Sequence, residues 1–189
     1  MKKIILILFL FLASLEAEER TANFAGGCFW CMEAVFQPLK GVTSVESGYM
    51  GGESVTANYK TVSSGTSGHY EVVQVRYDSD KITYKELLDV FWKNIDPTDE
   101  NGQFYDQGEQ YKTAVFYQNA KQKALAKQSK KDLNDSGRFS KDIATKIKPA
   151  KEFFKAEEHH QDYFKKNTLR YKMYKNASGR ENYKNKMWK

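Results

Sequence analysis

The sequence predicts one α/β domain in which strands and helices alternate. A length of 189 residues is typical of a single domain, and a composition of 40% hydrophobic and 14% aromatic residues is enough to fill a core. Some segments alternate apolar and polar residues with a period of two, and others repeat apolar residues at helical spacing. Neither an internal repeat nor a low-complexity linker divides the chain.

The predicted strands share short apolar or alternating patterns. They cover residues 22–25, 42–47, 69–77, 112–117 and 143–147. The predicted helices share apolar residues three and four positions apart, and Thr83 is the expected N-cap of the second one. They cover residues 28–37, 82–91, 120–133 and 153–164. Residues 55–68 are predicted to be irregular chain and residues 96–108 a long polar loop, while residues 171–189 show no clear periodicity.

The N-terminus has the pattern of a secretory signal peptide. Lys2 and Lys3 precede an unbroken apolar run over residues 4–13, and Ala17 is the expected cleavage position. The run is too short for a comfortable transmembrane helix. We therefore expect a signal peptide over residues 1–17, a single catalytic domain over residues 18–189, and an exported protein, periplasmic or secreted, without stable membrane insertion.

The formal net charge is +6. Basic charge together with many aromatic residues is one feature of nucleic-acid-binding proteins. The lysines of this chain are spread along its whole length, however, which is typical of a solvated surface. We therefore expect no nucleic acid partner.

Both cysteines lie in one motif, Gly-Gly-Cys-Phe-Trp-Cys, at residues 26–31. The glycine pair predicts a tight strand-to-helix turn with Cys28 in the first turn of the helix, where free N–H groups and the helix dipole favour an anion. A lowered pKa would make Cys28 a thiolate nucleophile. Cys31 follows one turn later on the same face, within reach of a disulfide. A structural pair of thiols and half of a zinc site are the alternatives, and the spacing favours redox chemistry.

Glu71 lies on the strand predicted at residues 69–77. It shares the more apolar face of that strand with Val73 and Val75, so it is expected to point into the core. Burial raises the pKa of a carboxyl group, and a glutamic acid that is still protonated near neutral pH is a general acid. The alternative is a glutamate that reaches water or pairs with Arg76 or a lysine.

Two tyrosines flank loops that contain glycine. Tyr49 follows the strand predicted at residues 42–47, and Tyr111 precedes the strand at residues 112–117. Either the two side chains pack on the surface, or their hydroxyl groups point into a shared cleft.

Five stretches of the chain resemble, in order, the peptide methionine sulfoxide reductase A family. They are Gly-Gly-Cys-Phe-Trp at residues 26–30, Gly-Tyr-Met-Gly-Gly at 48–52, Gly-His-Tyr-Glu-Val-Val at 68–73, Asp-Gln-Gly-Glu-Gln-Tyr at 106–111 and Ala-Glu-Glu-His-His-Gln-Asp-Tyr at 156–163. Each is weak by itself, and together they are highly specific and span nearly the whole mature chain.

The resemblance implies a fold and a reaction. The fold is a two-layer α/β sandwich, a ferredoxin-like plait whose mixed sheet carries packed helices, with a shallow, exposed active site. In the reaction, the Cys28 thiolate attacks the sulfur of an S-epimer methionine sulfoxide, free or in a protein, while Glu71 protonates the departing oxygen. Cys28 is left as a sulfenic acid.

The resemblance also assigns supporting roles. Tyr49 and Tyr111 would hydrogen-bond the sulfoxide oxygen, and Phe29 and Trp30 would form the pocket for the substrate methyl group. Asp106 would support the site. No bound cofactor and no metal are expected, and the biological role would be repair of oxidised proteins by a monomer.

Cys31 departs from the commonest pattern of the family, which has glycine there and a recycling cysteine in the C-terminal tail. The tail of this chain has no cysteine. We therefore predict that Cys31 resolves the Cys28 sulfenic acid as a disulfide, which a thioredoxin-like or other dithiol reductant then reduces.

Two other classes of function remain open. A thiol–disulfide oxidoreductase would explain the two cysteines, although neither Pro97 nor Pro149 has the strand-start context of the proline found in thioredoxin-like folds. A zinc-stabilised binding module would use the two cysteines with His159 and His160, although zinc-binding histidines are usually three to five residues apart.

Overall fold

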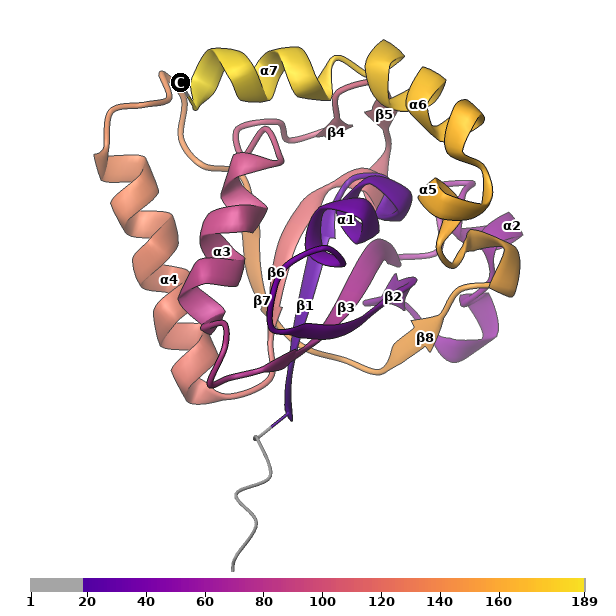
Figure 1. The fold of residues 1–189 in the computed structure, drawn as a ribbon, viewed down its shortest axis with the longest axis horizontal. Helices are drawn as coiled ribbons and strands as arrows, with labels where there is room; N and C mark the ends of the chain where they lie inside the picture. Colours follow the sequence, from indigo (N-terminus) through magenta and orange to yellow (C-terminus); the bar gives the residue numbers. More distant parts are fainter. Residues whose placement is uncertain (1–18, 189) are drawn as a thin grey trace, which may run out of the picture.

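A six-stranded mixed sheet forms the centre of the computed structural model, which describes residues 19–188 (Figure 1). The strands lie in the order β7-β6-β1-β3-β2-β8; β6 and β7 pair in parallel, and the other neighbours pair antiparallel. The strands are β1 (Glu19–Gly26), β2 (Val42–Met50), β3 (Tyr70–Asp78), β6 (Thr113–Tyr117), β7 (Lys146–Pro149) and β8 (Phe153–Lys155). A separate two-stranded ribbon pairs β4 (Gly102–Gln103) with β5 (Asp106–Gln107).

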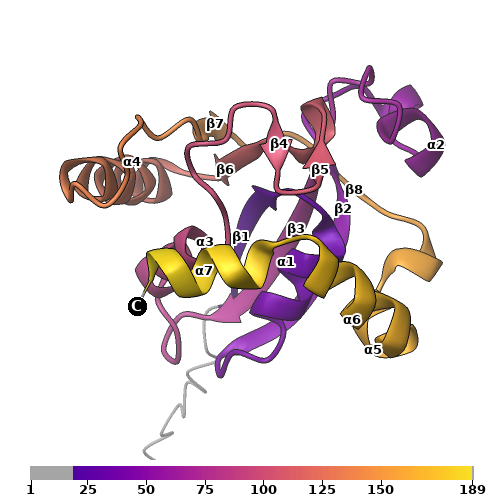
Figure 2. The ribbon, with the colours of Figure 1, turned by 90° about the horizontal axis from the view of Figure 1, so that it is seen from above.

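Helices cover the sheet and one of its ends. Figure 1 shows α1 and α3 on the near side of the sheet, with α6 and α7 along its upper end, and Figure 2 shows α7 and α6 passing beside α1. The α-helices are α1 (Phe29–Phe36), α2 (Tyr59–Val62), α3 (Tyr84–Lys93), α4 (Ala120–Asp135), α5 (Tyr163–Lys166), α6 (Thr168–Ala177) and α7 (Arg180–Met187). The 3₁₀ turns are η1 (Ser54–Thr56), η2 (Glu109–Tyr111) and η3 (Glu158–His160).

The main core lies between the sheet, α1 and α3. Phe24 of β1 is fully buried, and its ring lies 5.0 Å from that of Phe36 and 5.2 Å from that of Phe91, measured between centroids. Such pairs stabilise a core beyond the burial of their apolar area. The packing of Phe24 thus holds the first strand and the two helices in fixed positions.

The register of β1 against β3 places the glutamate predicted as general acid. Phe24 pairs with Val73, and the two strands run antiparallel, so Glu71 lies at the same end of the sheet as Gly26, where α1 begins. On the other side of β3, Glu71 pairs with Tyr49 of β2. Glu71, Tyr49 and the turn that leads to Cys28 therefore meet at one end of the sheet.

The structure confirms the expected strands around β1, β2, β3 and β6 and the helices near α1, α3 and α4. Thr83 caps α3, as expected, by accepting a hydrogen bond from the backbone of Glu86, whose side chain returns to the backbone of Thr83. The strand expected at residues 143–147 begins later, at Lys146.

Two element predictions were wrong. Residues 55–68 contain η1 and α2 in place of irregular chain. Residues 153–164 are not one helix, because 153–155 pair with the exposed edge of β2 and Asp162 takes a left-handed backbone conformation with φ of 54°. The segment without periodicity proved helical as α6 and α7, in which only Tyr171 and Arg180 are buried.

The expected signal peptide lies outside the described residues. No helix within residues 19–188 has the length and apolar character needed to cross a bilayer.

Candidate active site

Cys28 caps the N-terminus of α1. It lies one position before the helix in which we expected it, and its carbonyl accepts the N–H groups of Cys31 at 3.1 Å and Met32 at 3.4 Å. Gly27 precedes it with φ of 81°, a conformation that favours glycine. The Cys28 side chain is only 6% exposed, so the shallow, exposed site implied by the resemblance is not what this conformation shows.

The two thiols are both buried at the start of α1, and each affects the pKa of the other. Burial raises the pKa of the Cys28 thiol well above its usual value, and the contact with Cys31 raises it further. The same contact lowers the pKa of Cys31 to about 7. The predicted lowering of the Cys28 pKa is therefore wrong for this conformation, because desolvation outweighs the free N–H groups at the start of the helix. Within the reduced pair, these effects favour the negative charge on Cys31 over Cys28.

Glu71 is 2% exposed and lies against the start of α1. Its Oε2 accepts the backbone N–H of Phe29 at 3.0 Å. Burial raises the pKa of Glu71 to about 8, Asp106 and Cys31 raise it too, and the Phe29 N–H opposes the shift. The carboxyl group therefore holds a proton at neutral pH. The alternative of a Glu71–Arg76 pair is wrong, since Arg76 lies 3.8 Å from a carboxylate oxygen of Glu19.

The two tyrosines lie within the electrostatic reach of this carboxyl group. Tyr49 is fully buried, and Tyr111, in η2, is half-buried; burial raises the pKa of both hydroxyl groups, and so does Glu71. The Tyr49 hydroxyl donates to Oε2 of Glu157 at 2.7 Å. The surface-packing alternative is thus wrong for Tyr49, and its hydroxyl must leave Glu157 to donate to a substrate.

The aromatic pair after Cys28 is held from the C-terminal part of the chain. The ring of Trp30 stacks on Tyr163, with centroids 3.7 Å apart and an interplanar angle of 8°. Its Nε1 donates to Nδ1 of His160 at 3.1 Å. Phe29 is buried, with its ring centroid 5.2 Å from that of His160 and 6.0 Å from that of Tyr49. These contacts fix both rings beside the thiol pair.

Asp106 joins the site from β5. It accepts a hydrogen bond from the hydroxyl of Tyr174 on α6. Burial raises the pKa of Asp106, and both this hydrogen bond and Arg180 oppose the shift. The structure therefore brings Asp106 near the thiols, whose pKa values it raises.

Sequence reasoning missed several residues that complete the site. Glu157 accepts the hydroxyl of Tyr49 and, through Oε1, the backbone N–H of Tyr59 at 2.8 Å. Glu157, His160 and Tyr163 lie in the last of the matching motifs, which was a signal that they belong to the site. Tyr59 had no such signal because it lies in a segment predicted to be irregular chain, and the others lie in residues 171–189, which lack a pattern. The missed residues are Tyr59, Glu157, His160, Tyr163, Tyr171, Tyr174 and Arg180.

The alternative zinc site is not assembled. Nδ1 of His160 accepts the Trp30 N–H, and its ring packs against those of Phe29 and Tyr59. Across residues 19–188, no three His, Cys, Asp or Glu side chains gather in a way that would hold a metal ion.

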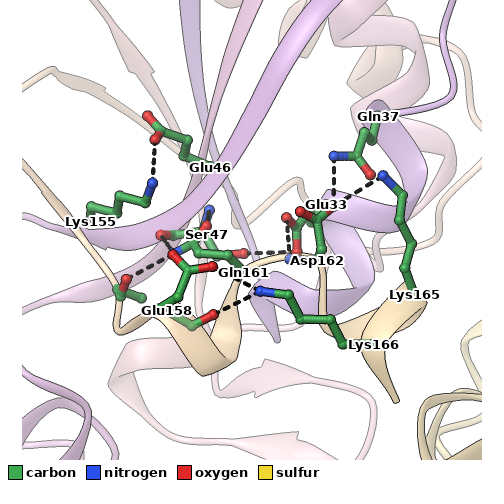
Figure 3. Close-up of polar contacts among 11 residues, drawn as sticks. Glu33, Gln37, Glu46, Ser47, Lys155, Glu158, Gln161, Asp162, Lys165 and Lys166 are labelled. Carbon is green, nitrogen blue, oxygen red and sulfur yellow. Dashed lines mark hydrogen bonds and ion pairs between the residues drawn. The ribbon is translucent and has the colours of Figure 1, made fainter. Parts of the chain in front are cut away.

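A second buried carboxyl group anchors the other side of α1 (Figure 3). Glu33 accepts the backbone N–H of Asp162 at 2.9 Å and the Ser47 hydroxyl at 3.3 Å. Gln161 beside it exchanges two hydrogen bonds with the backbone of Ser47, at 3.0 and 2.8 Å. Burial raises the pKa of Glu33 to about 7. The helix that contains Cys31 and begins directly after Cys28 is thus tied to β2 and to the turn before α5.

Comparisons with known proteins agree with this arrangement. Residues 20–189 match the family model described as peptide methionine sulfoxide reductase. The peptide methionine sulfoxide reductase MsrA of Bacillus licheniformis is 51% identical over 173 residues, which cover 91% of this chain and 96% of that protein.

Solved structures show the same fold. Mxr1 from Saccharomyces cerevisiae in reduced form is 32% identical with a TM-score of 0.76, covering 80% of this chain and 87% of the other. Mxr1 in complex with Trx2 aligns with a TM-score of 0.54 and 24% identity, covering 80% and 91%, a similarity of fold alone. From the extent of the family match and the identity to its bacterial relative, the chain belongs to the peptide methionine sulfoxide reductase A family.

Proposed function

We propose that this protein is a peptide-methionine (S)-S-oxide reductase that returns methionine sulfoxide, free or in proteins, to methionine. The observation that carries the proposal is the meeting of three groups at the start of α1: the Cys28 thiol, its partner Cys31, and a Glu71 carboxyl group that keeps its proton at neutral pH. Membership of the family supports the same reaction.

In the first step, the Cys28 sulfur attacks the sulfoxide sulfur as a thiolate, after passing its proton to the neighbouring Cys31 thiolate. The attack forms a bond between the two sulfur atoms, and Glu71 gives its proton to the sulfoxide oxygen. The oxygen then transfers to Cys28 as both the S–O bond of the sulfoxide and the new bond between the sulfur atoms break. The products are methionine, a Cys28 sulfenic acid and an ionised Glu71, so methionine gains the two electrons that Cys28 loses. Tyr49 and Tyr111 are proposed to donate to the oxygen, Phe29 and Trp30 to contact the methyl group, and Asp106 to support the site.

In the second step, Cys31 loses the proton that it received from Cys28 and attacks the sulfenic sulfur of Cys28 as a thiolate. The S–S bond forms, the S–O bond breaks, and the oxygen takes up one proton, which balances the one lost by Cys31, and leaves as water. The contact between the two thiols supports this role for Cys31. The disulfide would then be reduced by a thioredoxin-like dithiol protein, in line with the solved complex of yeast Mxr1 with Trx2.

Further proposals concern the whole protein. The basic and apolar residues at 2–13 support export to the periplasm or medium after cleavage near Ala17, where a monomer would repair oxidised proteins. The strand order β6-β1-β3-β2, with α1 between β1 and β2 and α3 between β3 and β6, supports a ferredoxin-like plait with helices in a second layer.

A single-turnover experiment tests the proposal. The reduced protein is mixed with a methionine sulfoxide peptide without added reductant, and methionine and free thiols are measured in the wild type and in Cys31→Ser. We expect one equivalent of methionine and loss of both thiols in the wild type, and one equivalent with a trapped sulfenic acid in Cys31→Ser. Absence of methionine, with efficient reduction of a disulfide substrate instead, would favour a thiol–disulfide oxidoreductase.

A further inference from the structure

Arg180, the first residue of α7, lies beside the turn that leads to Cys28. It is 3% exposed. Its Nη2 donates to the carbonyl of Gly26 at 3.1 Å, and its Nη1 donates to the carbonyl of Asn94 at 2.5 Å. A Cβ added to Gly27 would lie 3.0 Å from Nη2, so the guanidinium packs directly on the glycine pair. The last helix of the chain thereby fixes the backbone just before the nucleophile.

The charge of this guanidinium is not neutralised by an ion pair. Within residues 19–188, no carboxylate forms a salt bridge with Arg180, and its Nε has no hydrogen-bond partner. Its Cζ lies over the ring of Phe104, 4.6 Å from the centroid. A buried cation is costly unless negative charge lies nearby. An arginine kept in this position, with carbonyl oxygens as its partners, therefore favours an anion in the same neighbourhood.

Two groups nearby respond to that charge. Arg180 lowers the pKa of Cys31 and opposes the raised pKa of Asp106. Within the reduced pair, the negative charge is favoured on the thiol of Cys31. Burial and Asp106 act against this charge, whereas Cys28, Arg180 and the Tyr171 hydroxyl favour it. The charged or titratable groups that act on Cys31, or on which it acts, are Cys28, Glu71, Asp106, Tyr171, Tyr174 and Arg180.

We propose that Arg180 is a positioning residue for the second step: it holds the Gly26–Gly27 turn and supplies the positive charge beside which the Cys31 thiolate attacks the Cys28 sulfenic acid. The inference rests on the proposed function, because it assumes that Cys31 is the resolving thiol. In this step the Cys31 sulfur donates its electron pair to the sulfur of Cys28, and the oxygen leaves as water after taking up one proton. Arg180 exchanges no atom or electron.

The experiment follows both steps in one single turnover. Methionine is measured after acid quench, and closure of the disulfide is measured as loss of the sulfenic acid to a trapping reagent, from about pH 6 to pH 9.5. The variants are Arg180→Gln, which removes the charge, and Arg180→Lys, which keeps it. Thermal unfolding of each variant reports its stability.

We expect closure in Arg180→Gln to be about fivefold slower than in the wild type at pH 7, the result of a rise of one unit in the pKa of the attacking thiol, and to approach the wild-type rate at high pH. Arg180→Lys should restore the wild-type pH profile even if it unfolds at a lower temperature. The proposal would be overturned if disulfide closure in Arg180→Gln had the pH profile of the wild type. It would also be overturned if closure were slower by the same factor at every pH.

If Arg180→Gln does not fold, Arg180→Lys becomes the decisive variant. In this variant, the rate of disulfide closure should keep the wild-type pH dependence. A pH profile of closure displaced to higher pH would overturn the role of the charge. Methionine formation by the wild type is the separate control. Its absence would refute the proposed function, whereas normal methionine formation with an unchanged Arg180→Gln profile would refute this inference alone.

Discussion

The backbone N–H of Phe29 donates to the carboxyl group of Glu71 at 3.0 Å. One hydrogen bond therefore joins the first residue of α1 to the central strand β3, and it aligns the proposed general acid with the residue that follows the nucleophile. Burial keeps this carboxyl group protonated near neutral pH in spite of the N–H donor, which favours its charged form. The relationship leads directly to a prediction about pH.

Glu71→Gln removes the proton that the sulfoxide oxygen receives. Since general acids contribute about 10²–10⁴-fold, we expect methionine formation in a single turnover to fall by roughly that factor. Because the pKa of Glu71 is raised to about 8, the acid is present below that pH, and its contribution to the wild-type rate should be lost as the pH rises through about 8. The measurement is the rate of methionine formation from pH 6 to 9.5.

Glu33→Gln is the matched control for this profile, since Glu33 is also a buried carboxyl group with a raised pKa, on the same helix. It should keep the decline near pH 8. A Glu71→Gln variant with the rate and profile of the wild type would contradict the assignment of the general acid.

Tyr49→Phe removes a hydroxyl group that is proposed to donate to the sulfoxide oxygen. In enzymes that bind an oxyanion, loss of one hydrogen-bond donor lowers the rate constant by about 10²–10³-fold. We therefore expect the rate of methionine formation to fall at least tenfold. Tyr84→Phe is the control, because within residues 19–188 the buried Tyr84 hydroxyl has no hydrogen-bond partner. Its loss should leave both activity and stability close to the wild type. Equal rates in the two variants would remove Tyr49 from the mechanism.

Gly27→Ala places a Cβ in a crowded, left-handed turn. The added atom would lie 2.6 Å from Cβ of Gln103, and the φ of 81° is strained for alanine. We expect the free energy of unfolding to fall by about 2–4 kcal/mol, from strain and overpacking together. Gly137→Ala isolates the strain, because Gly137 has φ of 67° and no heavy atom within 4 Å of an added Cβ. Urea unfolding gives the loss in free energy of unfolding for each variant. An equal loss in the two would show that the atoms around Gly27 add no destabilisation beyond the backbone strain.

The raised pKa of Glu33 leads to a predicted pH dependence of the free energy of unfolding. Its pKa is about 7 in the folded protein and 4.5 in an unfolded chain, so the folded state holds more protons between these values. The free energy of unfolding should therefore decrease as the pH rises from about 4.5 to 7, through the contribution of Glu33. Glu33→Gln removes this contribution and should flatten the slope relative to the wild type, measured by urea unfolding at several pH values.

Glu158→Gln is the control for that series. The ion pair with Lys166, at 2.9 Å, lowers the pKa of Glu158, so its titration lies below this window. The substitution should leave the slope between pH 5 and 7 unchanged. A Glu33→Gln protein with the wild-type slope would show that Glu33 is charged throughout that range.

The sequence was most informative where local pattern and packing agree. Alternation along residues 69–77 predicted the burial of Glu71 because a strand with one apolar face has little freedom in its orientation. The pKa of Cys28 was mispredicted for the opposite reason. Position at a helix start is local information, whereas desolvation depends on distant parts of the chain, and the turn before Cys28 packs against Gln103 of β4 and Arg180 of α7. The polar helices α6 and α7 bury few side chains, so no periodic apolar pattern marked them.

The contact between Arg180 and Gly26 joins residues 154 positions apart. During synthesis, the N-terminal part of the chain leaves the ribosome long before α7 exists, so the turn at Gly26 and Gly27 is then without its guanidinium. The Cys31 thiol of a growing chain consequently lacks the charge of Arg180, one of the groups that lower its pKa in the finished protein. The turn before Cys28 can therefore gain its contact with the guanidinium only after Arg180 has been synthesised, and loss of Arg180 would remove a support from a turn 154 positions earlier in the chain.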